Sequence, residues 1–241
     1  MPDLPKLPRT APAIVRRIYE AAAARHAPVF KPRLAMSQIG GCERNLWAEL
    51  QKIPSERELE GRIAVLFEHG DAVEELVVGL LKQAGYKVQE EDPKTHEQIR
   101  LEALDGRFSG YIDGQILFEQ GWKLLEIKSA NTKQFERLKE MGYEAWNPKY
   151  AAQVQVYMGY MGLDDALALV MCKDTSELYA EKIRFDRDAF AALEEKARGI
   201  LDSEVVPARP AEAKSQYCQF CKYCDRNQWC WGPLAEVSFD A

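Results

Sequence analysis

The sequence predicts an α/β protein, because strand-like and helix-like stretches alternate along its 241 residues. Residues 110–131 (GYIDGQILFEQGWKLLEIKSAN) read as two strands joined by a turn near residues 118–121. Residues 58–84 carry a long amphipathic helical pattern, and the apolar run at 166–174 has the length of a buried strand. A chain with 46% hydrophobic residues can bury one good core.

Composition bounds the class of protein. Residues 1–10 are Pro-rich and charged, which argues against a signal peptide and favours a frayed end. No apolar run approaches the roughly 18 residues of a membrane span, so we expect a soluble, cytoplasmic protein. The net charge of -6 argues against a protein that coats nucleic acid indiscriminately, although a local basic groove is compatible with it.

The remaining elements follow from periodicity and from Gly, Pro and Asn punctuation. Helices are expected at 11–26, directly after Cys42, at 132–142, at 148–162 and at 188–202. Strands are expected at 86–91, 97–103 and 178–186, the last as partner of the 166–174 strand. Residues 205–216 read as a linker.

The strand pair carries the first candidate site. Strand side chains alternate, so Glu126 and Lys128 share one face and Ile127 points to the other. Asp113 can approach Glu126 across the pair, and two carboxylates repel unless a positive group lies between them. A hard divalent cation with oxygen ligands removes that repulsion. Lys128 could then orient and deprotonate a water or steady a phosphate oxygen; the alternative is that all three are solvated strand charges.

Two helices carry further candidates. His69 interrupts the apolar pattern beside Gly70, and one of its ring nitrogens could join the metal shell. The alternative is a histidine that is exposed or paired with Glu68. Glu74 and Glu75 are expected to be solvated helix charges. Gln153 and Tyr157 stand four positions apart in the second helix, so they share one helical face.

Four of the six cysteines fall within thirteen residues, at Cys218, Cys221, Cys224 and Cys230. In a protein of this class such clustering favours a metal or cluster site over disulfides. Zinc could take the four local thiolates, whereas an iron–sulfur cluster that used Cys42 with Cys221, Cys224 and Cys230 would tie both ends of the chain together. Cys172, inside an apolar strand, is expected in the core.

These motifs occur in a specific order: His69, GYID ending at Asp113, EIK at 126–128 and QVQVY at 153–157, flanked by one early and three late cysteines. They resemble the RecB-type branch of the PD-(D/E)XK nucleases over residues 35–232. Within it the chain is similar to the CRISPR-associated and phage-encoded iron–sulfur exonucleases and to the AddB nuclease domain. The chain departs from the pattern in two places, since GYID lacks the proline and Cys218 is a fifth candidate thiol beside Cys42 and the three late cysteines.

The resemblance implies a restriction-endonuclease-like core, with a central mixed sheet flanked by helices. It divides the chain into an N-terminal helical part (1–57), the nuclease core (58–204) and a cysteine-rich segment (205–241), with a helical [4Fe-4S] lobe formed by both ends. Mg²⁺ or Mn²⁺ would be held by His69, Asp113, Glu126 and the Ile127 carbonyl. Lys128 would be the catalytic lysine. The cluster ligands would be Cys42, Cys221, Cys224 and Cys230, and Gln153 and Tyr157 would line the catalytic site.

The implied function is a Mg/Mn-dependent DNA exonuclease acting on single-stranded ends in DNA processing, recombination or repair. Recombination proteins, CRISPR adaptation proteins and further copies of the chain are the candidate partners besides DNA. Two other readings stay open: a DNA-end-binding or assembly module with an unused nuclease site, and a zinc-stabilised endonuclease on duplex DNA. The candidate base-stacking side chains are Trp47, Tyr111, Trp122, Tyr143 and Trp146.

Overall fold

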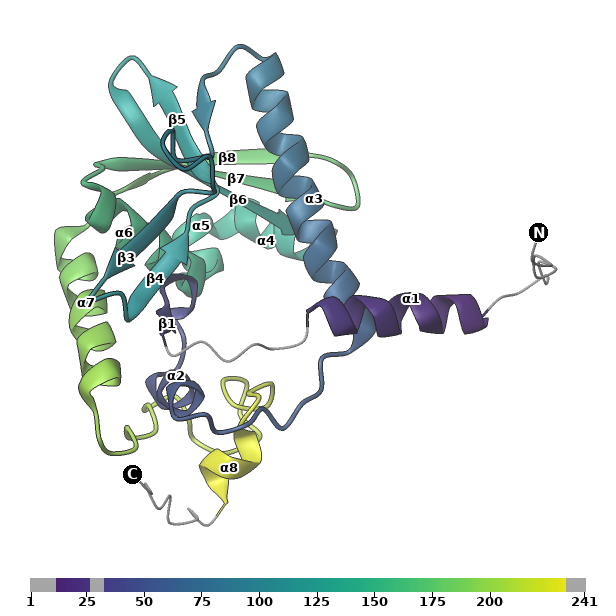
Figure 1. Ribbon diagram of the computed structural model, residues 1–241, viewed down its shortest axis with the longest axis vertical. Coiled ribbons are helices and arrows are strands. Elements are labelled where there is room, and N and C mark those ends of the chain that lie inside the picture. Colours follow the sequence, from purple (N-terminus) through teal and green to yellow (C-terminus); the bar gives the residue numbers. More distant parts are fainter. Residues whose placement is uncertain (1–11, 27–32, 233–241) are drawn as a thin grey trace.

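The computed structural model describes residues 12–26 and 33–232 (Figure 1). The expected fraying of residues 1–10 lies outside this described part. Within it, no helix is long and apolar enough to span a membrane. Helices and strands alternate, which confirms the predicted α/β fold.

The helices match the sequence periodicity closely, with short additional turns of helix. They are α1 (Pro12–Arg25), the 3-10 helix η1 (Met36–Gln38), α2 (Glu43–Leu50), α3 (Gly61–Gln83), α4 (Thr132–Met141), α5 (Tyr143–Trp146), α6 (Pro148–Met161), α7 (Arg187–Asp202) and α8 (Asn227–Trp231). The strands are β1 (Leu34–Ala35), β2 (Val88–Gln89), β3 (Arg100–Ala103), β4 (Phe108–Tyr111), β5 (Gly114–Phe118), β6 (Gly121–Ala130), β7 (Asp165–Cys172) and β8 (Leu178–Arg184).

The strands form two mixed sheets, where the sequence predicted one central sheet. One sheet has the order β1-β4-β3 and the other β2-β5-β6-β7-β8. The division falls inside the first strand predicted for residues 110–131, because the chain leaves β4 at Tyr111 and enters β5 only at Gly114. Gly114 has φ 154°, and a Cβ there would lie 3.0 Å from the Gln89 carbonyl oxygen, so only glycine fits this change of sheet.

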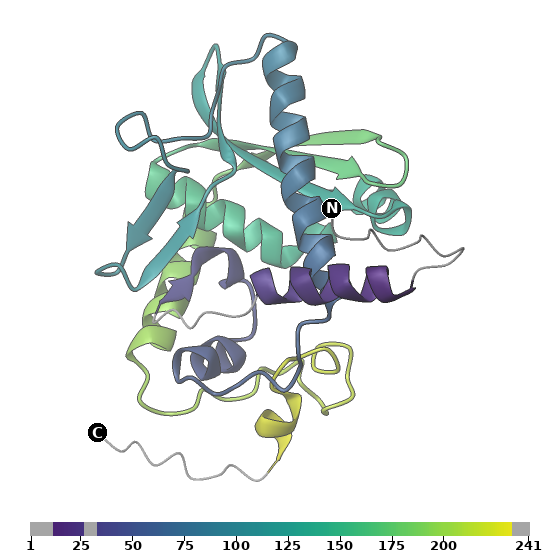
Figure 2. The same ribbon diagram turned by 45° about the vertical axis from the view of Figure 1, so that its right-hand side comes forward.

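The larger sheet is covered on both faces, as Figures 1 and 2 show. Strands β6 and β7 run parallel, and the other neighbours run antiparallel. On one face, Val73 and Val77 of α3 pack against Leu125 and Ile127 of β6. On the other face, helices α4, α5 and α6 form the larger core with side chains such as Leu124. Each face of β6 is therefore sealed by helices.

The last part of the described chain packs against the segment that follows α2. The Glu56 carboxylate accepts hydrogen bonds from the backbone N–H groups of Gln228 (2.9 Å) and Trp229 (2.6 Å). The Arg226 guanidinium donates to the Ile53 carbonyl at 2.7 Å. These contacts place the cysteine-rich segment against the loop that follows α2.

Candidate active site

Strand β6 places Glu126 and Lys128 on one face of the sheet. Glu126 pairs with Ala168 and Lys128 with Val170 of β7, while Ile127 between them packs under α3. The alternation predicted from the sequence is confirmed. Glu126 and Lys128 therefore point toward the face that α4, α5 and α6 cover.

Asp113 reaches this strand from the break between β4 and β5. Its Oδ2 accepts a hydrogen bond from the backbone N–H of Ile127 at 2.6 Å. The β5–β6 register, with Gly114 opposite Leu125, places Asp113 level with Glu126. The predicted approach of the two carboxylates is confirmed, although Asp113 lies outside a strand. This position leaves its side chain free to turn toward β6.

The Lys128 ammonium group lies among the groups that the resemblance assigns to the cation. Its Nζ is 2.5 Å from Glu126 Oε1, 3.0 Å from the Ile127 carbonyl oxygen and 3.7 Å from Asp113 Oδ2. Burial lowers the pKa of Lys128, but the carboxylates of Glu126 and Asp113 outweigh it and leave the pKa well above its ordinary value. Lys128 is therefore a fixed positive charge at neutral pH, which does not suit it to deprotonate water.

Glu126 is fully buried, and neither carboxylate oxygen has a hydrogen bond of normal geometry within the described chain. Oε1 has only the ion contact with Lys128. Burial raises the pKa of Glu126 to about 8, with Lys128 lowering it and Asp113 raising it further. Buried polar atoms without partners are rare in proteins. This carboxylate therefore has free lone pairs of the kind that a hard divalent cation binds.

Glu74 is a fourth charged group of this cluster, and the sequence analysis missed it. The side chain is half-buried on α3. Burial and then the Asp113 carboxylate raise its pKa to about 7. It is thus not the solvated helix charge that was expected, whereas Glu75 is exposed as predicted. The available signal was its place in the buried stripe with Val73 and Val77.

The structure does not bring His69 into this cluster. His69 is exposed, and in the described ranges it makes no hydrogen bond or ion pair. Five residues separate it from Glu74, which is roughly 140° around an α-helix. The predicted alternative partner, Glu68, binds Arg25 instead. Glu74 is therefore the α3 side chain that faces the carboxylates, and the role of His69 as a ligand stays a prediction without structural support.

Helix α6 supplies Gln153 and Tyr157, both buried and one turn apart as predicted. Burial first, and then the carboxylates of Glu126 and Asp113, raise the pKa of Tyr157 above its ordinary value. A Cβ at Gly110 would lie 2.8 Å from the Tyr157 hydroxyl oxygen, so β4 must carry glycine here for the tyrosine to fit. Both predicted residues of this motif thus lie on the helix side of the sheet that α4, α5 and α6 form.

The candidate stacking aromatics divide by burial. Trp47 and Tyr143 are buried, with relative exposures of 1% and 0%, so the structure contradicts them as platforms for bases. Trp47 instead donates from its indole N–H to the Ser203 carbonyl at 2.9 Å. Tyr111 is 44% exposed, and Trp122 and Trp146 are half-buried. These three keep an accessible surface.

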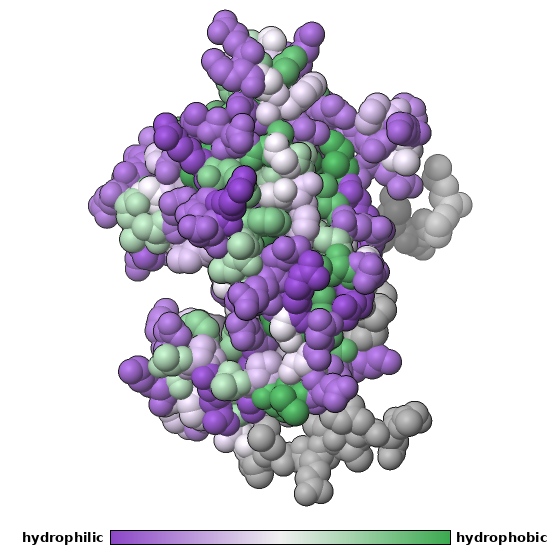
Figure 3. All heavy atoms as spheres, turned by 90° about the vertical axis from the view of Figure 1, so that its left-hand side faces the viewer, coloured by the Kyte–Doolittle hydropathy of each residue, from purple (hydrophilic) through white to green (hydrophobic). Residues whose placement is uncertain are grey.

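The cysteines gather at a second place, below the sheets. A cavity of about 1070 Å³ is lined by Cys42 from the early part of the chain and by all four late cysteines. Figure 3 shows the outline of the molecule indented between its upper and lower parts. Burial raises the pKa of Cys224, and the Cys42 and Cys230 thiols contribute, so thiols from both ends are neighbours. Cys172 is buried in β7, as predicted.

No three His, Cys, Asp or Glu side chains of residues 12–26 and 33–232 are arranged so that they could hold a metal ion as they stand. In the carboxylate cluster, the Lys128 ammonium lies beside oxygen atoms of Asp113 and Glu126, where a metal cation would otherwise balance their charge. In the cysteine cavity, five cysteines are among the lining residues. The donor types fit a hard cation at the first place and a thiophilic centre at the second.

Solved structures share this fold. The chain matches SSO0001 with a TM-score of 0.56 and 14% identity, over 92% of this chain and 98% of that one. It matches an alkaline exonuclease, LHK-Exo from Laribacter hongkongensis, with a TM-score of 0.52 and 16% identity, over 76% of this chain and 90% of that one. The same exonuclease in complex with dAMP gives a TM-score of 0.50 at 16% identity, over 77% and 90%. No protein-family model and no curated protein matches the chain.

Proposed function

We propose that the protein is a metal-dependent deoxyribonuclease that hydrolyses phosphodiester bonds at the ends of single-stranded DNA. The observation that carries this proposal is the buried Glu126 carboxylate, which lacks hydrogen-bond partners and lies beside Asp113 and Lys128. A carboxyl group in this setting lowers stability, and such groups are found mainly at functional sites. The fold shared with an alkaline exonuclease supports the same conclusion.

Asp113, Glu126 and the Ile127 carbonyl would hold Mg²⁺ or Mn²⁺, and Glu74 rather than His69 would be the ligand from α3. When bound, the cation would polarise a phosphoryl oxygen and lower the pKa of a water. The Ile127 N–H fixes Asp113 for this task through its 2.6 Å hydrogen bond. Burial under α4, α5 and α6 keeps bulk water away from Glu126 and strengthens its electrostatic interactions.

Lys128 would act as a permanent positive charge. Its raised pKa keeps the ammonium protonated, so it stabilises the negative charge that develops on the phosphate during attack. The Tyr150 ring, with its centroid 5.4 Å from Nζ, helps to hold the ammonium in place. Gln153 and Tyr157 would orient Lys128 or a phosphate oxygen from α6.

Three observations support DNA as the substrate. One matched structure is an exonuclease in complex with dAMP. The PD-(D/E)XK resemblance adds the preference for single-stranded ends and for DNA processing, recombination or repair in the cytoplasm. Tyr111 offers an accessible aromatic ring, and the Arg100 guanidinium lies 5.9 Å from its centroid. A base could stack on the ring while the guanidinium contacts a phosphate.

A [4Fe-4S] cluster is proposed for the cysteine cavity, held by Cys42, Cys221, Cys224 and Cys230. The support is that thiols from both chain ends line one cavity. Such a cluster would tie the two ends together, beyond the hydrogen bonds of Glu56 and Arg226. Zinc on the four local thiolates is the competing outcome, and a broad visible absorption distinguishes the coloured cluster from colourless zinc.

The deciding experiment is anaerobic purification followed by digestion of end-labelled linear and covalently closed circular single-stranded DNA, with Mg²⁺ or Mn²⁺. We expect progressive shortening of the linear strand and survival of the circle. Glu126→Gln provides the matched inactive control, because it keeps the shape of the side chain. Cleavage of the circle would contradict the exonuclease, and equal cleavage by Glu126→Gln would contradict the site.

A further inference from the structure

A row of three residues crosses the larger sheet on the face that α4, α5 and α6 cover. Glu126 of β6 pairs with Ala168 of β7, which pairs with Glu181 of β8. Directly paired residues share a face, and neighbouring strands lie about 4.8 Å apart, so the two glutamates stand roughly 10 Å from each other. Ala168 between them is fully buried and short. A side chain anchored at Glu181 can therefore lie across the sheet toward Glu126.

Tyr143 is anchored at the Glu181 end of this row. Its backbone N–H donates to Glu181 Oε2 at 2.9 Å, and the Tyr179 hydroxyl hydrogen-bonds the same oxygen. Gly142, with φ 77°, turns the chain so closely against Glu181 that a Cβ would lie 3.4 Å from Oε1. One carboxylate thus fixes the start of α5 over the sheet.

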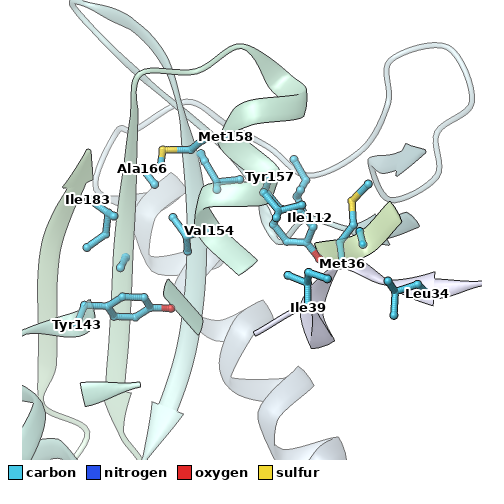
Figure 4. Close-up of a cluster of buried hydrophobic side chains, with 14 of the residues drawn as sticks. Leu34, Met36, Ile39, Ile112, Tyr143, Val154, Tyr157, Met158, Ala166 and Ile183 are labelled. Atoms are coloured by element: carbon cyan, nitrogen blue, oxygen red, sulfur yellow. The ribbon is translucent and has the colours of Figure 1, made fainter. Parts of the chain in front are cut away.

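The hydroxyl of Tyr143 lies at the other end of a fully buried side chain and has no hydrogen-bond partner among the described residues. Figure 4 shows the ring lying across the strands with its hydroxyl directed away from Ile183, a residue of β8. Burial first, and then the Glu126 carboxylate, raise the pKa of Tyr143 well above its ordinary value. The group is therefore a protonated donor beside a carboxylate that lacks hydrogen bonds.

We propose that Tyr143 is a positioning residue of the carboxylate site, whose hydroxyl donates a hydrogen bond to the Glu126 oxygen that the cation leaves free. This inference rests on the proposed function, because it takes Glu126 as a metal ligand. The buried donor and the buried acceptor would satisfy each other. Ligating carboxylates need such outer partners to fix their orientation and basicity. Glu181 would then affect Glu126 indirectly, because it holds Tyr143 in place.

The test is Mn²⁺ binding by calorimetry on the full chain without DNA. Tyr143→Phe removes one oxygen and should weaken Mn²⁺ binding about 10- to 100-fold, with an unchanged unfolding temperature in the absence of metal. Tyr160→Phe is the matched control, because its hydroxyl binds Glu194 at 3.1 Å, and it should bind Mn²⁺ like the wild type. Glu181→Gln keeps the anchor's shape with a weaker acceptor and should give a smaller loss.

The outcomes separate this inference from the function on which it rests. If Glu126→Gln loses Mn²⁺ binding while Tyr143→Phe and Glu181→Gln bind like the wild type, Tyr143 is a core side chain only. If Glu126→Gln itself binds normally, the proposed metal site is wrong. A loss of Mn²⁺ affinity in Tyr143→Phe that Tyr160→Phe does not show, with the fold unchanged in both, would support the positioning role.

Discussion

The charge balance of the candidate site is decided by a few side chains at the end of β6. Glu126 is buried without hydrogen bonds, Asp113 is fixed by the Ile127 N–H, and the Lys128 ammonium lies beside both carboxylates. Once Glu126 has lost its proton, two carboxylates and one ammonium leave a net negative charge, to which a deprotonated Glu74 adds. A divalent cation is the species that neutralises such a set.

Glu126→Gln and Asp113→Asn should each abolish cleavage, because each removes the charge of an oxygen ligand while keeping its shape. The loss should exceed the roughly 10- to 100-fold that outer partners contribute. Rates on end-labelled DNA, beside thermal unfolding, measure this. Glu75→Gln on the exposed side of α3 is the matched control. Near-normal rates in both variants would rule out the assignment.

Glu74→Gln should weaken Mn²⁺ binding and cleavage, whereas His69→Ala should leave both near wild type. The reason is that Glu74 is half-buried toward Asp113 and His69 is exposed. Calorimetric titration of both variants decides between them. A loss confined to His69→Ala would restore the histidine as the ligand.

Lys128→Ala should keep metal and DNA binding but lose turnover, since the ammonium acts on charge that develops in the transition state. Removing a charge 2.5 Å from Glu126 Oε1 should, if anything, tighten the cation. Single-turnover rates and DNA affinity separate the two effects. Lost affinity at unchanged turnover would limit the role of Lys128 to phosphate positioning.

At the scale of elements, the helices and the β5–β6 hairpin were predictable because their apolar periods are local. Helix α6 with Gln153 and Tyr157 is such a case. The division into two sheets was not predictable, because Asp113 leaves the strand to meet the Ile127 N–H, a partner 14 residues away. Glu74 was missed for a related reason. The role of a charged residue within an apolar stripe depends on its partner, here Asp113, which is distant in the sequence.

Gly110→Ala should lower both activity and stability. The added Cβ would meet the Tyr157 hydroxyl at 2.8 Å and Met36 Cβ at 2.9 Å, so Tyr157 must move. Overpacking of this kind typically costs about 1–3 kcal/mol of unfolding free energy. Gly79→Ala on α3 meets nothing within 4 Å and should stabilise by up to about 1 kcal/mol. Urea unfolding and cleavage rates measure both, and an unimpaired Gly110→Ala would show that the contact is not tight.

At the scale of the whole molecule, stability should depend on pH through the buried acids. The pKa of Glu126 is raised to about 8 and that of Glu74 to about 7, from an ordinary 4.5. Between pH 4.5 and about 8, these two glutamates are ionised in the unfolded chain but still hold protons in the folded chain. The free energy of unfolding therefore falls as pH rises through this range. Urea unfolding across this range should show the slope, and Glu126→Gln should reduce it. A flat wild-type profile would contradict the burial of Glu126.

Mn²⁺ should raise the unfolding temperature more at pH 8 than at pH 6, because the cation competes with the proton on Glu126. Thermal scans at fixed Mn²⁺ test this, with Glu126→Gln as the variant that should not respond. Equal stabilisation at both pH values would show that the ion binds elsewhere.

Loss of any proposed cluster ligand should bleach the protein and lower its solubility. The variants are Cys42→Ala, Cys221→Ala, Cys224→Ala and Cys230→Ala. Cys218→Ala and Cys172→Ala should leave iron nearly unchanged, and Cys172, buried in β7 beside the Thr132 hydroxyl, is the internal control. A shared cluster closes a long loop, so its loss should unfold both ends together. Iron and sulfide per chain decide it. Full iron in Cys42→Ala, with loss in Cys218→Ala, would favour the four local thiols.

The contact between Trp47 and Ser203 also sets an order of events on the ribosome. The two residues are 156 positions apart, and at roughly 5–20 residues per second the first must wait about 8–30 s for the second to be made. During this interval the indole of Trp47 and the apolar side of α2 have no cover from α7 in the nascent chain. Holding chaperones that cover this apolar surface until Ser203 has been made should therefore improve the yield of recombinant protein.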